Sequence, residues 1–289
     1  MAADTSIGTL RIGELARRTG VSPELLRAWE QRYGLLQPSR SAGGFRLYSE
    51  EDERRVRATT TLIGQGLSAA EAARRALAEA DEAHDTDQPL IARLSADLRS
   101  ALDAFDTQRA HVAFDELLAS VSVDTVLRGV LIPYLAELGE RWQRGQASVA
   151  QEHFASNLIR GRLLGLSRDW GNVAGPTVIL ACPPGEEHDL ALIMFGIAVS
   201  RRGRRVLFLG ADTPVETLRD AVDAAKPSAV VLAVSDAGVV SANARLLREL
   251  AQEARVLLCG AGATSEAVAA IGAERLEGDP VTAAERFSG

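Results

Sequence analysis

Residues 177–190 read TVILACPPGEEHDL, an apolar run that leads into a polar loop with three acidic residues and a histidine. The run TVILAC has the length and composition of a buried strand. Three similar runs follow, each after a helical stretch: RVLFLG (205–210), SAVVLAVS (228–235) and RVLLCG (255–260). Strands that alternate with helices predict a parallel sheet with crossover helices, and we place this α/β domain at residues 174–289.

The loop after the first strand carries a candidate metal ligand, His188. In an open parallel sheet, ligands bind in the loops at the carboxyl ends of the strands. An imidazole in such a loop can ligate a metal, and Glu186 is a carboxylate nearby in sequence. The sequence does not assign Glu186 as the partner that orients the ring. An exposed loop histidine without a function is the simpler alternative.

Two breaks divide the rest of the chain. Residues 81–89, DEAHDTDQP, are polar and acidic without an apolar anchor, and we predict a linker there. A helical pattern stops at the Gly and Pro of residues 170–176, WGNVAGP. Residues 90–170 between the breaks carry apolar positions at helix spacing and no strand-like run, so this part is predicted to be a helical domain.

A second candidate site lies in that helical domain. A helix ends near Gly145, and a new one begins where Ser148 can cap it. Val149, Glu152 and His153 then follow at helix spacing on one face. Trp142 precedes the turn and can cover the same space as that face. Burying a carboxylate and an imidazole requires partners, which favours a ligand there, whereas a core tryptophan beside a surface Glu–His pair is the alternative.

Residues 1–80 predict a winged helix-turn-helix domain. A short amphipathic helix that contains Ile12 can end at Gly20, and Ser22 with Pro23 can start a second helix. The apolar side chains of the second helix share one face, and Arg27 points away from it. The second helix is therefore predicted to enter the major groove of DNA.

A hairpin wing is predicted after the second helix. Residues 37–49, QPSRSAGGFRLYS, place a Gly-Gly turn between two short polar-apolar strands. Arg40 and Arg46 lie where a wing would contact phosphates, and Ser49 and Ser68 are predicted to cap the helices that follow. A small helical interaction domain with solvated arginines is the alternative.

The overall charge of −7 argues on its face against a nucleic-acid partner, but charge acts locally. Residues 1–49 hold seven Arg and four acidic residues, a positive surplus in a chain that is negative overall. The composition is 46% hydrophobic, without an apolar run long enough for a membrane span, and the N-terminus lacks the pattern of an export signal. Cys182 and Cys259 cannot form a disulfide scaffold, so a cytoplasmic protein is expected.

The stretch IGELARRTGVSPELLRAWEQRYGLLQPSRSAGGFRLYSEEDERRV resembles the DNA-binding domain of the MerR family of transcriptional regulators. By this resemblance Arg27, Arg40, Arg46 and Tyr48 contact double-stranded DNA. The family dimerises through a long coiled coil, yet no heptad pattern persists past residue 80. The resemblance therefore implies that any dimer forms through the rest of the chain.

The remaining chain resembles the cobalamin-binding module of corrinoid proteins, a four-helix bundle followed by a Rossmann-like, flavodoxin-like domain. Glu186 and His188 match the first half of the family motif, and the later elements of the motif match Ser235, Gly260 and Gly262. Joined to the MerR part, nearly the whole chain resembles the CarH/LitR family of adenosylcobalamin photoreceptors.

This resemblance implies roles for both candidate sites. His188 is the lower axial ligand of cobalt, with Glu186 beside it, and the nucleotide tail lies near Ser235, Gly260 and Gly262. The bundle covers the upper, adenosyl-bearing face through four residues, Trp142, Val149, Glu152 and His153. In the family, a tetramer assembled with the cofactor in the dark binds operator DNA as a repressor, and light releases it by breaking the cobalt–carbon bond.

Two positions depart from the family pattern. Ala191 replaces the motif glycine three residues after His188, and Gln143 follows Trp142 where some relatives carry a histidine. These departures keep open a MerR-type regulator that senses cobalamin, or another ligand, without light. An enzyme is the third alternative, since the same module serves methyltransferases and mutases, but no part of the chain is left for their large catalytic domain.

Overall fold

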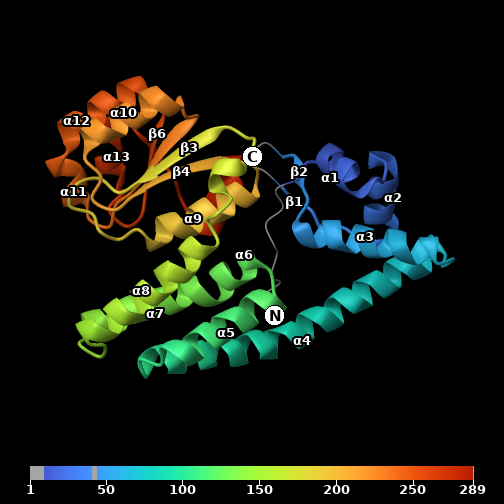
Figure 1. Cartoon of the computed structure of the whole chain (residues 1–289). Coiled ribbons are helices and arrows are strands. Elements are labelled where there is room, and N and C mark those ends of the chain that lie inside the picture. The colour runs from blue at the N-terminus through green and yellow to red at the C-terminus, as the bar shows by residue number, and fades with distance from the viewer. Residues whose placement is uncertain (1–9, 41–43, 289) are drawn as a thin grey trace. The chain divides into compact units, whose positions relative to one another are not determined.

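The structure is a computed structural model that describes residues 10–40 and 44–288, and only the backbone of residues 50, 79–88 and 288. It divides into two units, one that ends at Arg93 and one that spans Leu94–Ser288. The predicted fold class is confirmed: a helix-turn-helix part with a two-stranded wing, a helical region, and an α/β domain with a parallel sheet (Figure 1). No helix among the described residues has the length and apolar character needed to cross a membrane.

The first unit has the order expected of a winged helix-turn-helix. Its elements are α1 (Ile12–Thr19), α2 (Pro23–Tyr33), β1 (Ser39–Arg40), β2 (Arg46–Leu47) and α3 (Glu50–Gly64). Gly20 ends α1 in the left-handed conformation at φ 71°, and Ser22 accepts a hydrogen bond from Leu25 N to start α2. The hydroxyls of Ser49 and Ser68 accept hydrogen bonds from backbone N–H groups of the helices that follow, as predicted. Gly43 of the predicted Gly-Gly turn lies outside the described residues.

Helix α4 (Ala69–Asp103) corrects the prediction for residues 81–89. That stretch is helical and contains Pro89 inside the helix, whereas turn and loop signals in the sequence predict a linker. The segment has no glycine, and polar residues such as its glutamate and glutamine are compatible with a helix, so the polarity of the segment alone does not indicate a break. The two units meet in the sequence within this helix, between Arg93 and Leu94.

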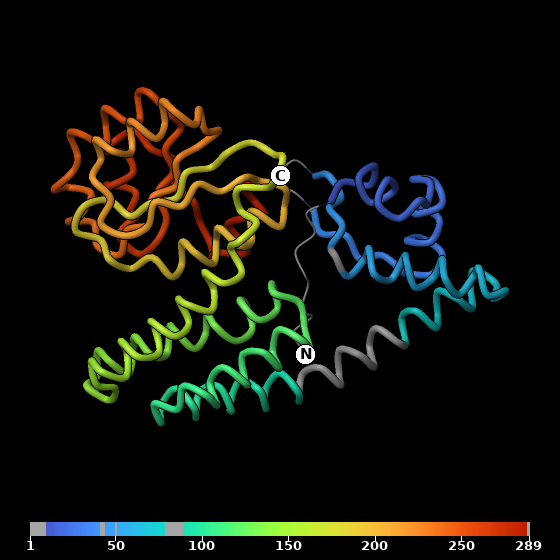
Figure 2. The backbone as a smooth tube through the Cα atoms, viewed as in Figure 1, coloured from blue at the N-terminus to red at the C-terminus, as the bar shows by residue number. Residues whose placement is uncertain are grey.

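The second unit begins with the helical bundle. After the end of α4 come α5 (Thr107–Ser120), α6 (Val123–Val126), the π-helix η1 (Leu127–Leu131), α7 (Ile132–Gln143) and α8 (Val149–Gly165). Ion pairs join α4 to α7 through Arg141–Asp103, and α5 to α8 through Arg162–Asp115, around an apolar interior. Ser148 caps α8 in the predicted capping box with Gln151. The backbone trace in Figure 2 follows these helices from green to yellow.

The α/β domain holds a five-stranded sheet in the order β4-β3-β5-β6-β7, of which all paired strands are parallel. The strands are β3 (Thr177–Ala181), β4 (Arg205–Gly210), β5 (Ala229–Ala233), β6 (Val256–Cys259) and the short β7 (Glu274–Arg275), and only β7 was not predicted. This is the flavodoxin-like strand order. From β3 the chain adds β4 on one side of the sheet and then β5 on the other, so the topological switch point lies between β3 and β5. A ligand site is therefore expected at the carboxyl ends of those two strands.

Helices cover both faces of the sheet: α9 (Leu190–Arg201), α10 (Val215–Ala225), α11 (Ala237–Ala242), α12 (Ala244–Glu253), α13 (Ser265–Ile271) and α14 (Pro280–Ser288). A short 3-10 turn, η2 (Trp170–Asn172), precedes the sheet. Trp170 is buried, and its ring lies so close to Gly196 of α9 that a Cβ there would come within 2.8 Å. The break predicted at residues 170–176 thus contains a packed core residue.

Candidate cofactor and DNA-binding sites

His188 lies in the loop between β3 and α9, at the carboxyl edge of the sheet. Its side chain is 79% exposed, whereas Glu186 two residues earlier is buried. His188 Nδ1 lies 2.7 Å from Glu186 Oε1, and the hydroxyl of Ser235, after β5, donates to Oε2 of the same carboxylate at 2.6 Å. The backbone N–H of Ser235 also donates to Oε2. The residues that follow two neighbouring strands thus meet at the switch point.

The carboxylate of Glu186 decides which ring nitrogen of His188 is available. Burial raises the pKa of Glu186, but hydrogen bonds from Ser235 and His188 outweigh that effect and hold the pKa below its usual range. An ionised carboxylate at Nδ1 places the imidazole proton there, which leaves the lone pair on Nε2. No hydrogen bond to Nε2 is found among the described residues, so this nitrogen is free to ligate a metal.

A single outward imidazole fits a corrinoid, because the corrin ring itself supplies four nitrogen ligands to cobalt. Within the described part of the chain, no cluster of three or more His, Cys, Asp or Glu side chains is arranged to hold a metal ion. Ala191 lies in the first turn of α9 with its methyl group exposed, where it contacts no packed interior. The residues at this edge of the sheet therefore fit a corrinoid, the cofactor that the sequence resemblance implies.

Gly260 and Gly262 follow β6 beside Ser235, but the structure gives them a different reason to be small. The resemblance places the nucleotide tail near both glycines. A Cβ on Gly260 would lie 2.4 Å from the carbonyl oxygen of Val234, and one on Gly262 would lie 2.6 Å from the backbone of Asp236. The backbone of the neighbouring loop therefore excludes side chains at both glycines, whatever ligand binds near them.

Trp142 and Val149 lie on either side of the α7–α8 turn and are both about half exposed, at 50% and 55%. The alternative of a core tryptophan at this position is therefore wrong. Both side chains are accessible to a ligand, as the predicted site requires. Gln143, next to Trp142, is exposed as well.

Glu152 and His153 continue this surface along α8. Glu152 accepts a hydrogen bond from Ser156 at 2.6 Å, and its other oxygen lies 3.6 Å from His153 Nε2. The spacing of Val149, His153 and Ser156 puts them on one stripe of α8, which Arg160 continues one turn later. Arg160 forms an ion pair with Asp189, the residue after His188. The sequence does not predict this contact, because Arg160 and Asp189 lie 29 residues apart on different elements.

In the first unit, Arg27 on α2 and Arg40 and Arg46 on the wing are exposed, as DNA contacts must be. Arg46 donates from Nε to Glu30 of α2 at 2.9 Å. This ion pair joins the wing to the predicted recognition helix, and no pattern in the sequence predicts it.

Tyr48 corrects a predicted DNA contact. Its side chain is fully buried, and its hydroxyl donates to Glu30 at 2.7 Å. Burial raises the pKa of Tyr48, and the Glu30 carboxylate beside it raises that pKa further. Tyr48 therefore positions Glu30, and through it Arg46, and does not itself present a group to DNA.

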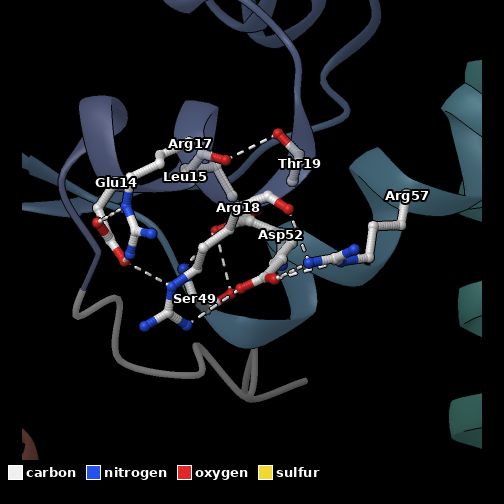
Figure 3. Close-up of polar contacts among 9 residues, drawn as sticks. Glu14, Leu15, Arg17, Arg18, Thr19, Ser49, Asp52 and Arg57 are labelled. Atoms are coloured by element: carbon white, nitrogen blue, oxygen red, sulfur yellow. Dashed lines mark hydrogen bonds and ion pairs between the residues drawn. The ribbon is translucent and has the colours of Figure 1, made fainter. Parts of the chain in front are cut away.

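A second polar network joins α1 to α3 on the same unit (Figure 3). Arg17 and Arg18 donate to Glu14, and these hydrogen bonds lower the pKa of Glu14 from 4.5 to about 2. Arg57 of α3 donates to the carbonyl oxygen of Arg18 at 2.8 Å. Several arginines that sequence reasoning counted as positive surplus are thus paired with carboxylates of the same unit.

Comparison with known proteins agrees with this division. The family described as MerR HTH family regulatory protein matches residues 10–79, and the B12 binding domain family matches residues 94–164. The HTH-type transcriptional repressor CarA of Myxococcus xanthus is 38% identical over 227 residues, which cover 78% of this chain and 76% of CarA. CarH of the same organism is 35% identical over 233 residues, or 78% of each protein.

The solved structures add the fold of the second unit. The monomethylamine corrinoid protein of Methanosarcina barkeri superposes with a TM-score of 0.55 at 17% identity, and covers 66% of this chain and 95% of that protein. The domains and fold define a MerR-type, B12-binding transcriptional regulator. Within that class, the chain belongs to the family of the CarA and CarH regulators.

Proposed function

We propose that this protein is a light-responsive, adenosylcobalamin-dependent transcriptional repressor and has no enzymatic activity. The observation that carries the proposal is His188, exposed at the switch point of the sheet with Nδ1 held by a buried carboxylate and Nε2 directed away from it. The family relationship supports it, since both relatives are named as transcriptional repressors.

In this proposal the two parts of the second unit hold opposite faces of the cofactor. His188 would hold the cobalt through Nε2, Glu186 would orient the imidazole, and Ser235 with Gly260 and Gly262 would hold the nucleotide tail. When bound, adenosylcobalamin supplies a cobalt–carbon bond that visible light breaks. The exposed surface of Trp142, Val149, Glu152 and His153 covers the upper face in the dark.

The apolar character of that surface links ligand loss to assembly. Covering half-exposed side chains such as Trp142 and Val149 stabilises the ligand-bound form, because apolar area leaves water. When the adenosyl group leaves, the same side chains lose their cover. We propose that the dark, cofactor-bound form is an oligomer, in the family's manner a tetramer, and that light dissociates it.

In this proposal the first unit binds DNA. Arg27 on α2 would face bases or phosphates in the major groove, and Arg40 and Arg46 would contact phosphates from the wing. Each copy of the chain carries one helix-turn-helix, so an oligomer would place several on one operator. Dissociation would then lower the affinity for operator DNA, as fewer units bind together.

A second candidate is a regulator that senses cobalamin, or another ligand, without a response to light. Ala191 and Gln143 favour it, because both differ from the family pattern at positions next to the proposed ligands. The exposed methyl of Ala191 adds bulk on the edge where the corrin would bind.

Dark and light reconstitution separates these candidates. The full chain is mixed with adenosylcobalamin in the dark, passed through gel filtration, and compared with an identical sample after illumination. The proposal predicts cobalamin that co-elutes with an oligomer in the dark, and a change of spectrum and elution volume in light only. Co-elution without any effect of light would favour the cobalamin sensor, and absence of cobalamin would overturn cobalamin-dependent function.

A further inference from the structure

One ion pair joins the loop of His188 to the helical bundle. Arg160 of α8 donates from Nε to both carboxylate oxygens of Asp189, at 3.0 and 2.9 Å, and from Nη2 to one of them at 2.6 Å. The Asp189 side chain is only 3% exposed. A buried carboxylate held at both oxygens by one guanidinium is a geometrically specific contact.

The position of Asp189 makes this contact unusual. Asp189 is the residue that precedes α9, where an aspartate normally accepts a hydrogen bond from the first turn of its own helix. Here its side chain makes no such bond, and both oxygens face Arg160 instead. The end of the His188 loop is thus fixed to a helix of the bundle, and loses its buried partner if that helix moves away.

Helix α8 carries the other half of the candidate site on the same stripe. His153 precedes Arg160 by seven residues, which is two turns, or about 10 Å along the helix axis. Val149 lies one turn further toward the start of α8. A single rigid helix therefore sets the distance between the upper-face residues and the loop that bears the proposed lower ligand.

We propose that Arg160 is a positioning residue of the cofactor site, which holds the His188 loop in register with the upper-face stripe of α8. This inference rests on the proposed function, because it takes His188 as the ligand of cobalt. The pair gives the bundle a direct mechanical connection to the residue next to that ligand.

The chain offers a matched control at a second junction between bundle and α/β domain. Arg128 of η1 donates to Glu285 of α14 at 2.6 Å, and Arg202 lies 3.2 Å from the same carboxylate. Arg128→Met removes an arginine and an ion pair between the two parts, as Arg160→Met does. In Arg128→Met, Glu285 still has Arg202 as a partner, and the lost ion pair does not involve the His188 loop.

The test compares full-length wild type, Arg160→Met, Arg160→Lys and Arg128→Met. Hydrogen exchange of the backbone amides of residues 185–193 is measured without cobalamin. The dark absorption spectrum and dissociation constant are then measured with adenosylcobalamin. We expect Arg160→Met to speed hydrogen exchange in residues 185–193. It should also weaken adenosylcobalamin binding about tenfold, since loss of a residue that supports a metal ligand typically has an effect of this size. The spectrum should shift toward the form without histidine ligation. Arg160→Lys should restore part of each change, and Arg128→Met should leave all three readouts near wild type.

Equal behaviour of Arg160→Met and Arg128→Met in spectrum and exchange would overturn the inference. If Arg160→Met does not fold, Arg160→Lys carries the same comparison, since it keeps the charge but loses the bidentate geometry. A wild type that binds no cobalamin would contradict the proposed function. The exchange measurement would then still decide whether Arg160 holds the loop.

Discussion

Two aromatic residues, Tyr48 in the DNA-binding unit and Trp142 in the second unit, have opposite surroundings. In the DNA-binding unit Tyr48 is buried and serves Glu30, which in turn holds an arginine of the wing. At the α7–α8 turn of the bundle, Trp142 and Val149 are half exposed. Tyr48 thus acts through a buried polar network, whereas half of the Trp142 side chain is open to a ligand; the wing also has an exposed aromatic side chain, Phe45, at 59%.

This difference follows from the ligands. DNA phosphates are bound by charged arginine side chains. These can remain exposed to water and partly paired with carboxylates until DNA binding releases counterions. A corrinoid offers a broad, largely apolar face, so its site must present apolar area that no side chain of the protein covers. We therefore propose that the exposed Trp142 and Val149 contact the cofactor, and that the buried network of Tyr48 and Glu30 positions the wing for DNA.

The largest effect is expected at His188. His188→Ala removes the only protein ligand that we assign to cobalt, so the affinity for adenosylcobalamin should fall by more than the roughly 10–100-fold that outer-shell partners contribute. The dark spectrum should shift to a form without histidine ligation. Glu187→Ala, at the exposed neighbour, is the control. An unchanged spectrum in His188→Ala would mean that the ligand is a different residue.

Next in size is the apolar surface of the bundle. Trp142→Ala should weaken dark binding about tenfold or more, because covering a half-exposed tryptophan contributes about 1.5–3 kcal/mol. Val112→Ala removes a similarly exposed apolar side chain from α5 and should leave the dissociation constant unchanged. Equal losses in the two variants, measured by titration in the dark, would show that Trp142 does not contact the ligand.

A smaller effect is expected on the wing. Arg46→Ala should weaken DNA binding across sequences and lower the slope of log affinity against log salt by about one unit, as loss of one phosphate contact does. Arg17→Ala removes the same charge from an arginine that donates to Glu14, and should keep the slope. Fluorescence anisotropy over a salt series measures both, and a slope that is unaltered in Arg46→Ala argues against phosphate contact.

The smallest effect concerns Glu14. Its pKa is lowered to about 2 in the folded protein, so the stability it contributes is present above its ordinary pKa of 4.5 and is lost as the pH falls toward 2. Glu14→Gln should therefore unfold at a slightly lower temperature than wild type at neutral pH, and at the same temperature near pH 2. Thermal melts across this range test it; a difference independent of pH would contradict the assignment.

Much of the fold was readable from the sequence because its signals are local. The strand runs after residue 177, the caps at Ser22, Ser49 and Ser148, and the left-handed Gly20 each depend on a few neighbouring residues. The segment 81–89 was misjudged, because polarity and helix formation are compatible.

The candidate sites were readable only in part, because side-chain partners come from distant segments. The sequence indicated His188 and Trp142 but could not show that Glu186 meets Ser235, or that Arg160 reaches Asp189. Nor could it show that Tyr48 is buried, since the residue that buries its hydroxyl lies on another element. The sequence placed Gly260 and Gly262 near the nucleotide tail, which stays a prediction, and it could not show that the backbone of a neighbouring loop crowds both positions.

The most direct test of the account is the affinity for DNA before and after light. The full chain with adenosylcobalamin selects a duplex from a random library in the dark, and its binding to that duplex is then measured in the dark and after illumination of the same sample. We predict tight binding in the dark and a large loss of affinity in light, with no change in a sample without cobalamin. Equal affinity in dark and light would contradict the claim that the second unit controls the first through a light-sensitive cofactor.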